Sequence, residues 1–373
     1  VADMRMYQVT GSKLALAKAE AAVRWLGTVP GLGSGACPAA DYQWPYGHRG
    51  YLKTLETSSN YIKAALLLYQ ATGKASYLTG AQAQYAQVRR FFLARSVPLY
   101  TAYLFDNGSS CKALPGRYFA SVNGNMIWAG QALARATGQA VYLREAIGTA
   151  RAVQAHLSDA TGVFADLQAD NDIVGPLVEA MYALATTYHR SFALGWLTAN
   201  ASAAGADVNS LGEFGRFFDG PPPTSLATAW QTDGGIALAE AAAAVYPLGR
   251  PADPQFWAHA TFVTDAQGLA GKNLAGKMVR ISFTGRAIAI MGTIGAQCCL
   301  AGHARIFIDG VQTFNRTGIW QGYSSPARRQ ADQILFAWRW PVAGPHVITI
   351  EPASYDSEEG GTFFQMTGYR LVR

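Results

Sequence analysis

The sequence predicts a multidomain α and β protein, with an N-terminal (α/α) helical-hairpin barrel over residues 1–250 and a C-terminal antiparallel β-sandwich over residues 251–373. Three observations predict this arrangement. Four apolar helices with polar starts alternate with amphipathic helices in the first part. A proline-rich linker, PLGRPADP, follows at residues 247–254. Beyond the linker the hydrophobic period changes from about 3.6 residues to about two, which is typical of strands.

The apolar helix Leu55–Gly73 defines the pattern of the first part. It opens with hydrogen-bonding residues from Glu56 to Asn60, continues as an apolar run and ends at Gly73, which is expected as the left-handed residue after the helix. The same pattern recurs at Ser121–Gly138, Ala169–Tyr188 and Ala227–Val245. In a barrel of inner and outer helices, these polar starts would converge on one positively biased face, where ligands and carboxylates collect.

The other predicted elements surround these four. A helix is expected at Ser12–Leu26, with Ser12 as its N-cap, and a glycine- and proline-rich loop at Gly27–Gly50. The amphipathic partners are expected at Ser76–Ala94, Val141–Leu157 and Ser191–Ala204. Short alternating segments predict a jelly-roll-like sandwich with strands at Val279–Phe283, Ala287–Met291, Ala304–Ile308, Ile334–Arg339, His346–Glu351 and Thr367–Val372. Asp309-Gly310 predicts a hairpin turn.

Composition excludes several classes of function. The net charge is +6 over 373 residues and the basic residues are scattered, so we expect no nucleic-acid partner. Apolar runs of about 18 residues are interrupted by polar ones, so we expect no membrane span. The chain has six histidines and no cysteine pair with zinc-ligand spacing, which predicts no metal site and no cofactor. The acidic run 356–359 (DSEE) could hold a structural calcium ion, and a solvated loop is the alternative.

The four cysteines leave two readings open. Cys37 and Cys111 lie in loops that flank the same predicted face, so they form either a disulfide or two free buried thiols. Cys298 and Cys299 are adjacent in the β-region, and their state does not follow from sequence.

Carboxyl groups at the predicted face are the candidates for general acid–base chemistry, and cleavage of a glycosidic bond would need two of them across the scissile bond. Glu56 and Asp172 form the preferred pair, and Asp233 and Asp41 are the substitutes. A carboxyl group beside an apolar helix can have a raised pKa, as a general acid requires. The alternative role for any one aspartate is a helix cap.

Aromatic and amide side chains near the same face are the candidates for sugar binding, since flat rings stack on sugars and amides bind hydroxyl groups. They are Trp44, Tyr46, His48, Asn60, Asn123, Asn125, Trp128 and Trp230. Core burial is the alternative for Trp128 and Trp230, while Trp44, Tyr46 and His48 belong to a loop. In the sandwich, Trp338 and Trp340 share one face of a strand, which is either core or a stacking platform.

The cluster Tyr46, His48 and Arg49 suggests a second chemistry. Tyrosine and histidine can abstract a proton beside a uronate while arginine neutralises its carboxylate, as in a polysaccharide lyase. The alternative is a solvated loop cluster.

Two stretches resemble known families. The first stretch resembles the hairpins of six-hairpin (α/α) glycosidases, and most closely family 76 of the glycoside hydrolases, the endo-α-1,6-mannanases. The motifs that carry this resemblance are TGKASYL at 72–78, TGQAVYL at 137–143, GVFAD at 162–166 and Asn123-Gly124. The resemblance covers residues 55–245 and implies adjacent catalytic aspartates at the start of an inner helix, where this chain has Glu56 and Thr57. Residues 254–373 resemble β-sandwich modules appended to secreted bacterial glycosidases, which implies a carbohydrate-binding-module-like domain.

Together these observations predict a secreted or cell-surface bacterial glycoside hydrolase with a barrel-like catalytic domain, acting as a monomer on a polysaccharide or oligosaccharide. The alternatives are a polysaccharide lyase and a non-catalytic glycan-binding protein.

Overall fold

A computed structural model describes residues 1–28, 37, 41–44, 47–165, 173–206, 208–223, 229–245, 256–263, 278–294, 303–315, 317–318, 330–353 and 366–373. The chain divides into two compact units, Val1–Ala152 and Val153–Arg373. The later helices thus group with the C-terminal strands, and the predicted domain boundary after residue 250 stays a prediction. Within the described residues, no helix is both long enough and apolar enough to cross a bilayer.

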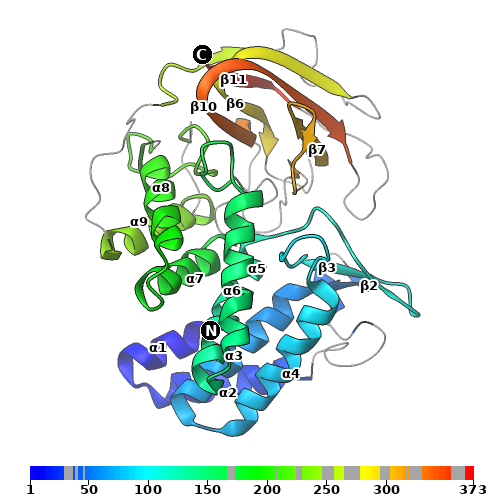
Figure 1. Ribbon diagram of the computed structural model, residues 1–373, viewed down its shortest axis with the longest axis vertical. Helices are drawn as coiled ribbons and strands as arrows, with labels where there is room; N and C mark the ends of the chain where they lie inside the picture. Colours follow the sequence, from blue (N-terminus) through cyan, green and yellow to red (C-terminus); the bar gives the residue numbers. More distant parts are fainter. Residues whose placement is uncertain are drawn as a thin grey trace. The chain divides into compact units, whose positions relative to one another are not determined.

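The first unit is built from helical hairpins and a small sheet (Figure 1). Its helices are α1 (Ala2–Thr10), α2 (Lys13–Leu26), α3 (Leu55–Thr72), α4 (Ala75–Phe92), α5 (Ala120–Thr137) and the start of α6 (Ala140–His156). Helix α3 packs against α2, α4 and α5, so it lies at the centre of the unit, as its apolar sequence predicts. Ser12 caps α2 by accepting a hydrogen bond from Ala15 N (3.3 Å). Helix α1 was not predicted.

Matching turns join the two helices of each hairpin, α3 to α4 and α5 to α6. Gly73 and Gly138 both adopt the left-handed conformation, with φ of 69° and 72°. In each turn the preceding threonine, Thr72 or Thr137, donates its hydroxyl to the carbonyl four residues earlier at 2.7 Å. Gly130 of α5 permits close packing on α6, since a Cβ there would lie 2.8 Å from Tyr142 O. These contacts explain the repeated Thr-Gly pairs in the sequence.

The predicted loop Gly27–Gly50 contains part of a sheet instead. A four-stranded antiparallel sheet joins β1 (Asp41–Trp44), β2 (Gly47–Thr54), β3 (Tyr103–Asp106) and β4 (Cys111–Ala113), in that order. Strand β2 runs directly into α3. The segment was predicted to be a loop because it is rich in glycine and proline, which are typical of loops.

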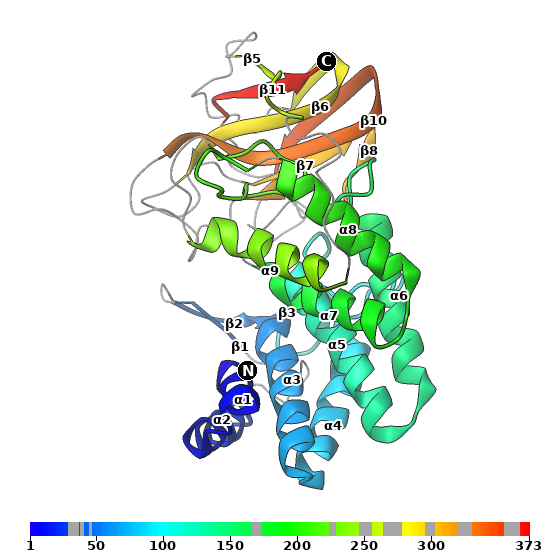
Figure 2. The ribbon, with the colours of Figure 1, turned by 90° about the vertical axis from the view of Figure 1, so that its left-hand side faces the viewer.

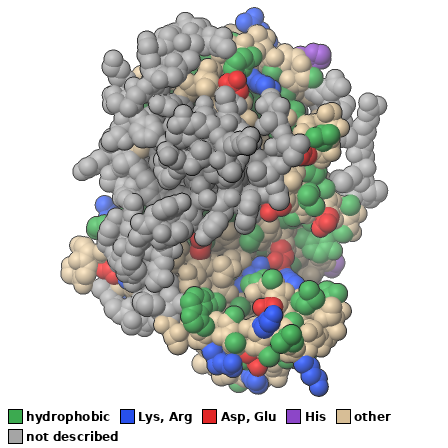
Figure 3. Space-filling model, turned by 180° about the vertical axis from the view of Figure 1, so that it is seen from behind, with side chains coloured by type: hydrophobic (Ala, Val, Ile, Leu, Met, Phe, Trp, Pro, Cys, Tyr) green, Lys and Arg blue, Asp and Glu red, His purple; other side chains and the backbone are tan. Residues whose placement is uncertain are grey.

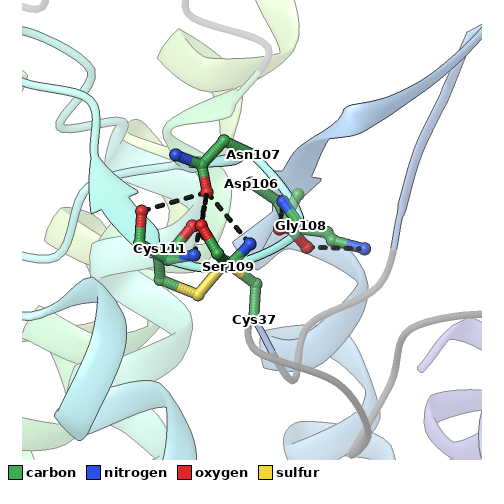
Figure 4. The surroundings of a disulfide bond; sticks show 8 residues. Cys37, Asp106, Asn107, Gly108, Ser109 and Cys111 are labelled. Atoms are coloured by element: carbon green, nitrogen blue, oxygen red, sulfur yellow. Dashed lines mark hydrogen bonds and ion pairs between the residues drawn. A yellow bond between two sulfur atoms is a disulfide. The ribbon is translucent and has the colours of Figure 1, made fainter.

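A disulfide between Cys37 and Cys111 ties this sheet to the preceding segment (Figure 4). The β3–β4 turn beside it is held by Asn107 Oδ1, which accepts hydrogen bonds from Ser109 N (3.0 Å) and Ser110 N (2.8 Å). Asp106 accepts from Gly108 N (2.8 Å) and pairs with Lys53 (3.5 Å). Of the two sequence readings, the disulfide is therefore confirmed. Cys298 and Cys299 lie outside the described residues.

The second unit combines helices with a larger sheet (Figure 2). Helices α7 (Gly175–Thr186), α8 (Ser191–Ala206) and α9 (Ala229–Val245) pack on one another. Helix α7 starts six residues later than predicted, with Pro176 in its first turn, where proline is well tolerated. Inside α8, Asn200 accepts a hydrogen bond from Phe164 N (2.7 Å) and so fixes the segment that follows α6.

The larger sheet is antiparallel and, in the described part of the chain, seven-stranded. Its order is β5 (Thr261–Val263), β11 (Gly368–Val372), β6 (Val279–Ile294), β10 (Gln330–Pro352), β7 (His303–Ile308) and β8 (Val311–Gln312), with β9 (Thr317–Gly318) paired to β7. The Asp309-Gly310 turn between β7 and β8 is confirmed, with both residues at positive φ. Antiparallel β-structure is thus established, while closure of a barrel and pairing into a sandwich stay predictions.

Four of the predicted strands are wrong in their bounds, because they fuse into two. Val279–Phe283 and Ala287–Met291 are both part of β6, and Ile334–Arg339 and His346–Glu351 are both part of β10. Gly285 makes no turn within β6, and a Cβ there would lie 2.6 Å from Val372 O. The glycine therefore permits the close approach of β11, and register shifts bend β10 without ending it.

Both faces of the larger sheet are buried. Ile288, Ile306 and Ile348 belong to the core on one face. Ala287, Ala289 and Met291 face the other side and are covered by Phe217, Phe256 and Trp257. Those covering residues come from the segments around α9, which explains why the helices and the sheet of this unit form one compact body.

Candidate functional site

Helix α3 carries Glu56 in its first turn. Thr54 caps the helix, its hydroxyl accepting a hydrogen bond from Glu56 N (3.2 Å). The Glu56 side chain is half-buried, and burial raises the pKa of its carboxyl group. Within the described residues its carboxyl group forms no hydrogen bond or ion pair. A carboxyl group in this setting favours the protonated form, which is the form a general acid uses.

A polar network joins α3 to α5 beyond Glu56. Lys63 Nζ donates to Asn125 Oδ1 at 3.3 Å, and Asn125 Nδ2 lies 3.3 Å from both Ser59 Oγ and Asn60 Oδ1. Ser59 donates in turn to the backbone oxygen of Glu56 (3.2 Å). Lys63, Ser59 and Asn125 are buried, whereas Asn60 is exposed. The network therefore runs from an exposed amide to a buried ammonium group.

Lys63 is the unexpected member of this network. Its ammonium group lies 5.4 Å from the centre of the half-buried Trp128 ring, a cation–π arrangement. Burial, with a smaller contribution from the positive charge of Arg5, lowers the pKa of Lys63 from 10.5 to about 7. The same side chain thus orients both the Asn125 amide and the Trp128 ring. Its signal in the sequence was a single charge inside the apolar run of α3.

Lys63→Met is expected to flatten the pH dependence of stability between about pH 7 and pH 10. In that range the unfolded chain keeps the lysine proton that the folded chain releases, so Lys63 makes stability rise with pH. Its contribution to the slope is at most about 1.4 kcal/mol per pH unit. Urea unfolding across this range measures the slope. The matched control is Lys74→Met, at a largely exposed lysine. Equal slopes in the wild type and Lys63→Met would contradict the prediction.

Asn123, a predicted sugar-binding residue, is occupied by the backbone. Its side chain is fully buried, accepts a hydrogen bond from Tyr100 N (2.9 Å) and donates to Tyr100 O (3.0 Å) and Phe119 O (2.9 Å). These bonds fix the segment before β3 against the start of α5. Its amide is therefore engaged by the backbone, and the sugar contact that its position predicted stays a prediction.

The other predicted site residues in the described part of the chain lie in β1, β2 and α9, and not on α3 or α5. Asp41 and Trp44 lie in β1 and His48 and Arg49 in β2, where the register pairs Asp41 with Lys53 and Trp44 with Gly47. Trp230 lies in the first turn of α9, and Asp233 follows in the second turn. The Asp233 side chain is exposed, and partial burial raises its pKa. Tyr46, Asp172 and the acidic run 356–359 lie outside the described residues.

The structure thus brings Glu56, Asn60, Asn125 and Trp128 onto two adjacent helices of the first unit, with Lys63 and Ser59 between them. Their geometry offers a carboxyl group of raised pKa, amide donors and acceptors, and an aromatic ring. No group of three or more His, Cys, Asp or Glu side chains in the described part of the chain could hold a metal ion. Figure 3 shows lysine and arginine side chains dispersed among acidic and hydrophobic ones on the described part of one face.

Comparison by sequence finds no matching family model and no matching curated protein. Comparison by structure finds the family 76 α-1,6-mannanase of a Salegentibacter species, with a TM-score of 0.59 and 19% identity over 66% of this chain and 73% of that one. An inactive variant of that enzyme, with two aspartates replaced by asparagine, was solved with α-1,6-mannotriose and matches with a TM-score of 0.58 and 21% identity over the same shares. The chain has the fold of the family 76 glycoside hydrolases.

Two further solved structures are also similar to the chain. A Listeria innocua protein matches with a TM-score of 0.56 and 19% identity, over 65% of this chain and 69% of that one. A family 76 hydrolase from a bovine Bacteroides thetaiotaomicron strain matches with a TM-score of 0.56 and 14% identity, over 65% of this chain and 53% of that one. The resemblance inferred from the Thr-Gly turns is thereby confirmed at the level of the fold.

Proposed function

We propose that the chain is a glycoside hydrolase that cleaves an extracellular polysaccharide or cell-wall glycan, with Glu56 as its general acid. The observation that carries this proposal is the half-buried carboxyl group of Glu56, whose pKa is raised by burial at the start of α3. A general acid must hold its proton near the working pH, and desolvation supplies that property.

The neighbours of Glu56 support a sugar substrate. Trp128 offers a flat ring, and the exposed Asn60 offers an amide group for ring hydroxyls, while the buried Asn125 donates to Asn60 and helps to hold it. Lys63 holds Asn125 and Trp128 in place, so the contacts are organised before a substrate binds. The family 76 fold adds support, since its solved members include an α-1,6-mannanase bound to a mannooligosaccharide.

The second carboxyl group of the reaction comes from outside α3 in this proposal. Thr57 occupies the position where the family resemblance implies the second aspartate, and a threonine cannot act as a carboxylate base. Asp172 is our proposed partner, with Asp233 and Asp41 as substitutes. The sequence resemblance alone would have implied an adjacent pair, so this is the main departure of the chain from family 76.

The disulfide Cys37–Cys111 supports the extracellular location, because such bonds persist in oxidising compartments and are rare in reducing ones. It joins segments 74 residues apart and ties β4 to the segment before β1.

The test is a screen of the purified protein against α-1,6-mannan and other bacterial and fungal cell-wall polysaccharides, with products separated by chromatography. Release of saturated oligosaccharides supports the proposal. An unsaturated uronate, detected by its ultraviolet absorption, would replace it with the lyase, and Tyr46, His48 and Arg49 would then be the residues to vary. Glycan binding without any product would overturn hydrolysis in favour of a non-catalytic glycan-binding protein.

A further inference from the structure

Exposed apolar side chains gather on the hairpin formed by α1 and α2. Val9 is 85% exposed, and Leu14 and Trp25 are each 67% exposed. Five of the 14 large hydrophobic residues that are exposed in the described part of the chain lie between Val1 and Trp25. Figure 2 shows this hairpin at the edge of the first unit, beside α3. Exposed apolar residues that are concentrated in one place mark an interaction surface, whereas scattered ones need no explanation.

Helix α2 has an apolar line on its exposed side. Leu14, Ala21 and Trp25 are exposed and lie 7 and 11 residues apart, so with about 3.6 residues per turn they follow one line along the helix. The buried residues of α2 lie on the opposite side, and they are Ala15, Ala19 and Val23. Helix α2 is therefore apolar on two sides, of which one is buried in the first unit and the other is exposed.

Helix α1 adds two residues to the exposed side. Met6 and Val9 lie three residues apart and are 56% and 85% exposed, whereas Met4 on the other side of α1 is buried. Gly11, with φ of 67°, makes the turn between the helices, and α1 packs along α2. The exposed sides of the two helices therefore adjoin. We call Met6, Val9, Leu14 and Trp25 together the hairpin face.

Basic side chains border the hairpin face on both sides of α2. Lys18 lies roughly 40° around the helix from Leu14, and Lys13 and Arg24 lie roughly 80–100° from it in the opposite direction. All three basic side chains are exposed. An apolar line between two rows of cations is the pattern of a helix that lies in the interface of a membrane.

Acidic side chains do not balance this positive border. Glu20 is the acidic residue of α2, and its carboxylate already accepts hydrogen bonds from Lys74 Nζ (2.7 Å) and Tyr77 Oη (3.2 Å). Asp3 is the acidic residue of α1, and it is half-buried. The outer side of the hairpin is therefore positively charged around its apolar centre, and it is complementary to an anionic surface that also has an apolar layer.

We infer that the hairpin face docks on the surface of an anionic phospholipid bilayer. Trp25 and Leu14 reach below the lipid headgroups, and the basic border lies against the lipid phosphates. A second copy of the chain fits less well, because a symmetric dimer would bring the same basic residues together from both sides. A nucleic acid fits less well too, since its phosphate backbone offers nothing to the apolar line. The inference is independent of the reaction proposed for Glu56.

The first experiment measures sedimentation of the intact protein with phosphatidylcholine vesicles that contain about 30% phosphatidylglycerol, at about 0.1 M salt. We expect binding to these vesicles, and binding at least about tenfold weaker to phosphatidylcholine alone. Lys13→Gln/Lys18→Gln/Arg24→Gln should weaken binding about a hundredfold, because each basic residue near an anionic surface contributes about fivefold. Leu14→Ser/Trp25→Ser should weaken it at least about tenfold, because it removes the apolar contact.

The second experiment measures insertion of Trp25. Brominated lipid tails quench the fluorescence of a tryptophan that touches them, and the chain has nine tryptophans, so the wild type is compared with Trp25→Phe. Phenylalanine keeps an apolar ring, so Trp25→Phe should still bind the anionic vesicles. The quenching seen in the bound wild type should be largely lost in this variant. Equal quenching in both proteins would overturn the docking of the hairpin face.

A matched control separates this surface from the net charge of the protein. Lys112→Gln/Arg135→Gln/Arg144→Gln removes the same charge from exposed positions elsewhere in the first unit and should bind as the wild type does. Thermal unfolding checks that the variants are folded, and Trp25→Ser alone replaces Leu14→Ser/Trp25→Ser if the double variant is not.

Three outcomes would overturn the inference. The first is absence of wild-type binding to the anionic vesicles, and the second is an equal loss of binding in the matched control. The third is a concentration-dependent dimer, measured by light scattering, that Leu14→Ser/Trp25→Ser abolishes, since the hairpin face would then bind a second copy of the chain.

Discussion

Glu56→Gln is expected to lower kcat by a factor of about 10²–10⁴ on whichever glycan the protein cleaves, because glutamine cannot donate the proton that the leaving oxygen needs. Substrate binding should be retained, since the amide has nearly the shape of the carboxyl group. The measurement is steady-state kinetics on the polysaccharide selected by product chromatography. Activity close to that of the wild type would show that Glu56 is not the acid.

The pH profile adds a second readout for Glu56. Burial raises the pKa of its carboxyl group, so the wild type should lose activity as pH rises through that raised value, when the acid gives up its proton. Glu56→Gln should lack this alkaline limb. The control is Glu20→Gln on α2, because a hydrogen bond from Lys74 lowers the pKa of Glu20 and it lies outside the network of Glu56. Its variant should keep the wild-type profile.

The double variant Cys37→Ser/Cys111→Ser is expected to lose about 4.5 kcal/mol of unfolding free energy. The disulfide joins residues 74 positions apart, and closing a loop of that length removes this much chain entropy from the unfolded state. Unfolding in urea, followed by tryptophan fluorescence, measures the loss. Substitution is preferable to chemical reduction here, because it acts on the Cys37–Cys111 bond alone.

A control for the disulfide variant comes from the turn beside it. Ser109→Ala removes a surface hydroxyl that bonds to Asn107 and leaves the disulfide in place, so it should cost well under 1 kcal/mol. An equal loss in both variants would show that the turn, and not the cross-link, stabilises the sheet.

The helical hairpins were predictable because local chemistry determines them. Ser12, Gly73 and Gly138 each act at a helix end through their own backbone or hydroxyl group, and the apolar run of α3 required a central position. The strands β1–β4 were not predictable in this way, since their pairing depends on contacts across the chain. Gly285 shows the same limit, because a distant strand and not a turn requires that glycine.

The site was predictable to a smaller extent. The order of residues along the apolar helices predicted that Glu56, Asn125 and Trp128 lie on neighbouring helices. It did not distinguish Asn123 from the predicted sugar contacts, although the Asn123 amide is hydrogen-bonded to the Tyr100 backbone. Lys63 was overlooked because a lysine in a helix is usually solvated, and only the packing of α3 on α5 shows that this one is buried.

The matching Thr-Gly turns also have a practical use. Thr72 lies 16 residues after Glu56 on the same helix, which corresponds to roughly 24 Å along its axis. A fluorophore or an affinity tag inserted beside Lys74 would thus lie far from the Glu56 end of α3, so we expect it to leave that end accessible. The turn at Gln139 offers an equivalent position on α5. A protein labelled at these two places would allow movements of the hairpins to be followed while a glycan binds.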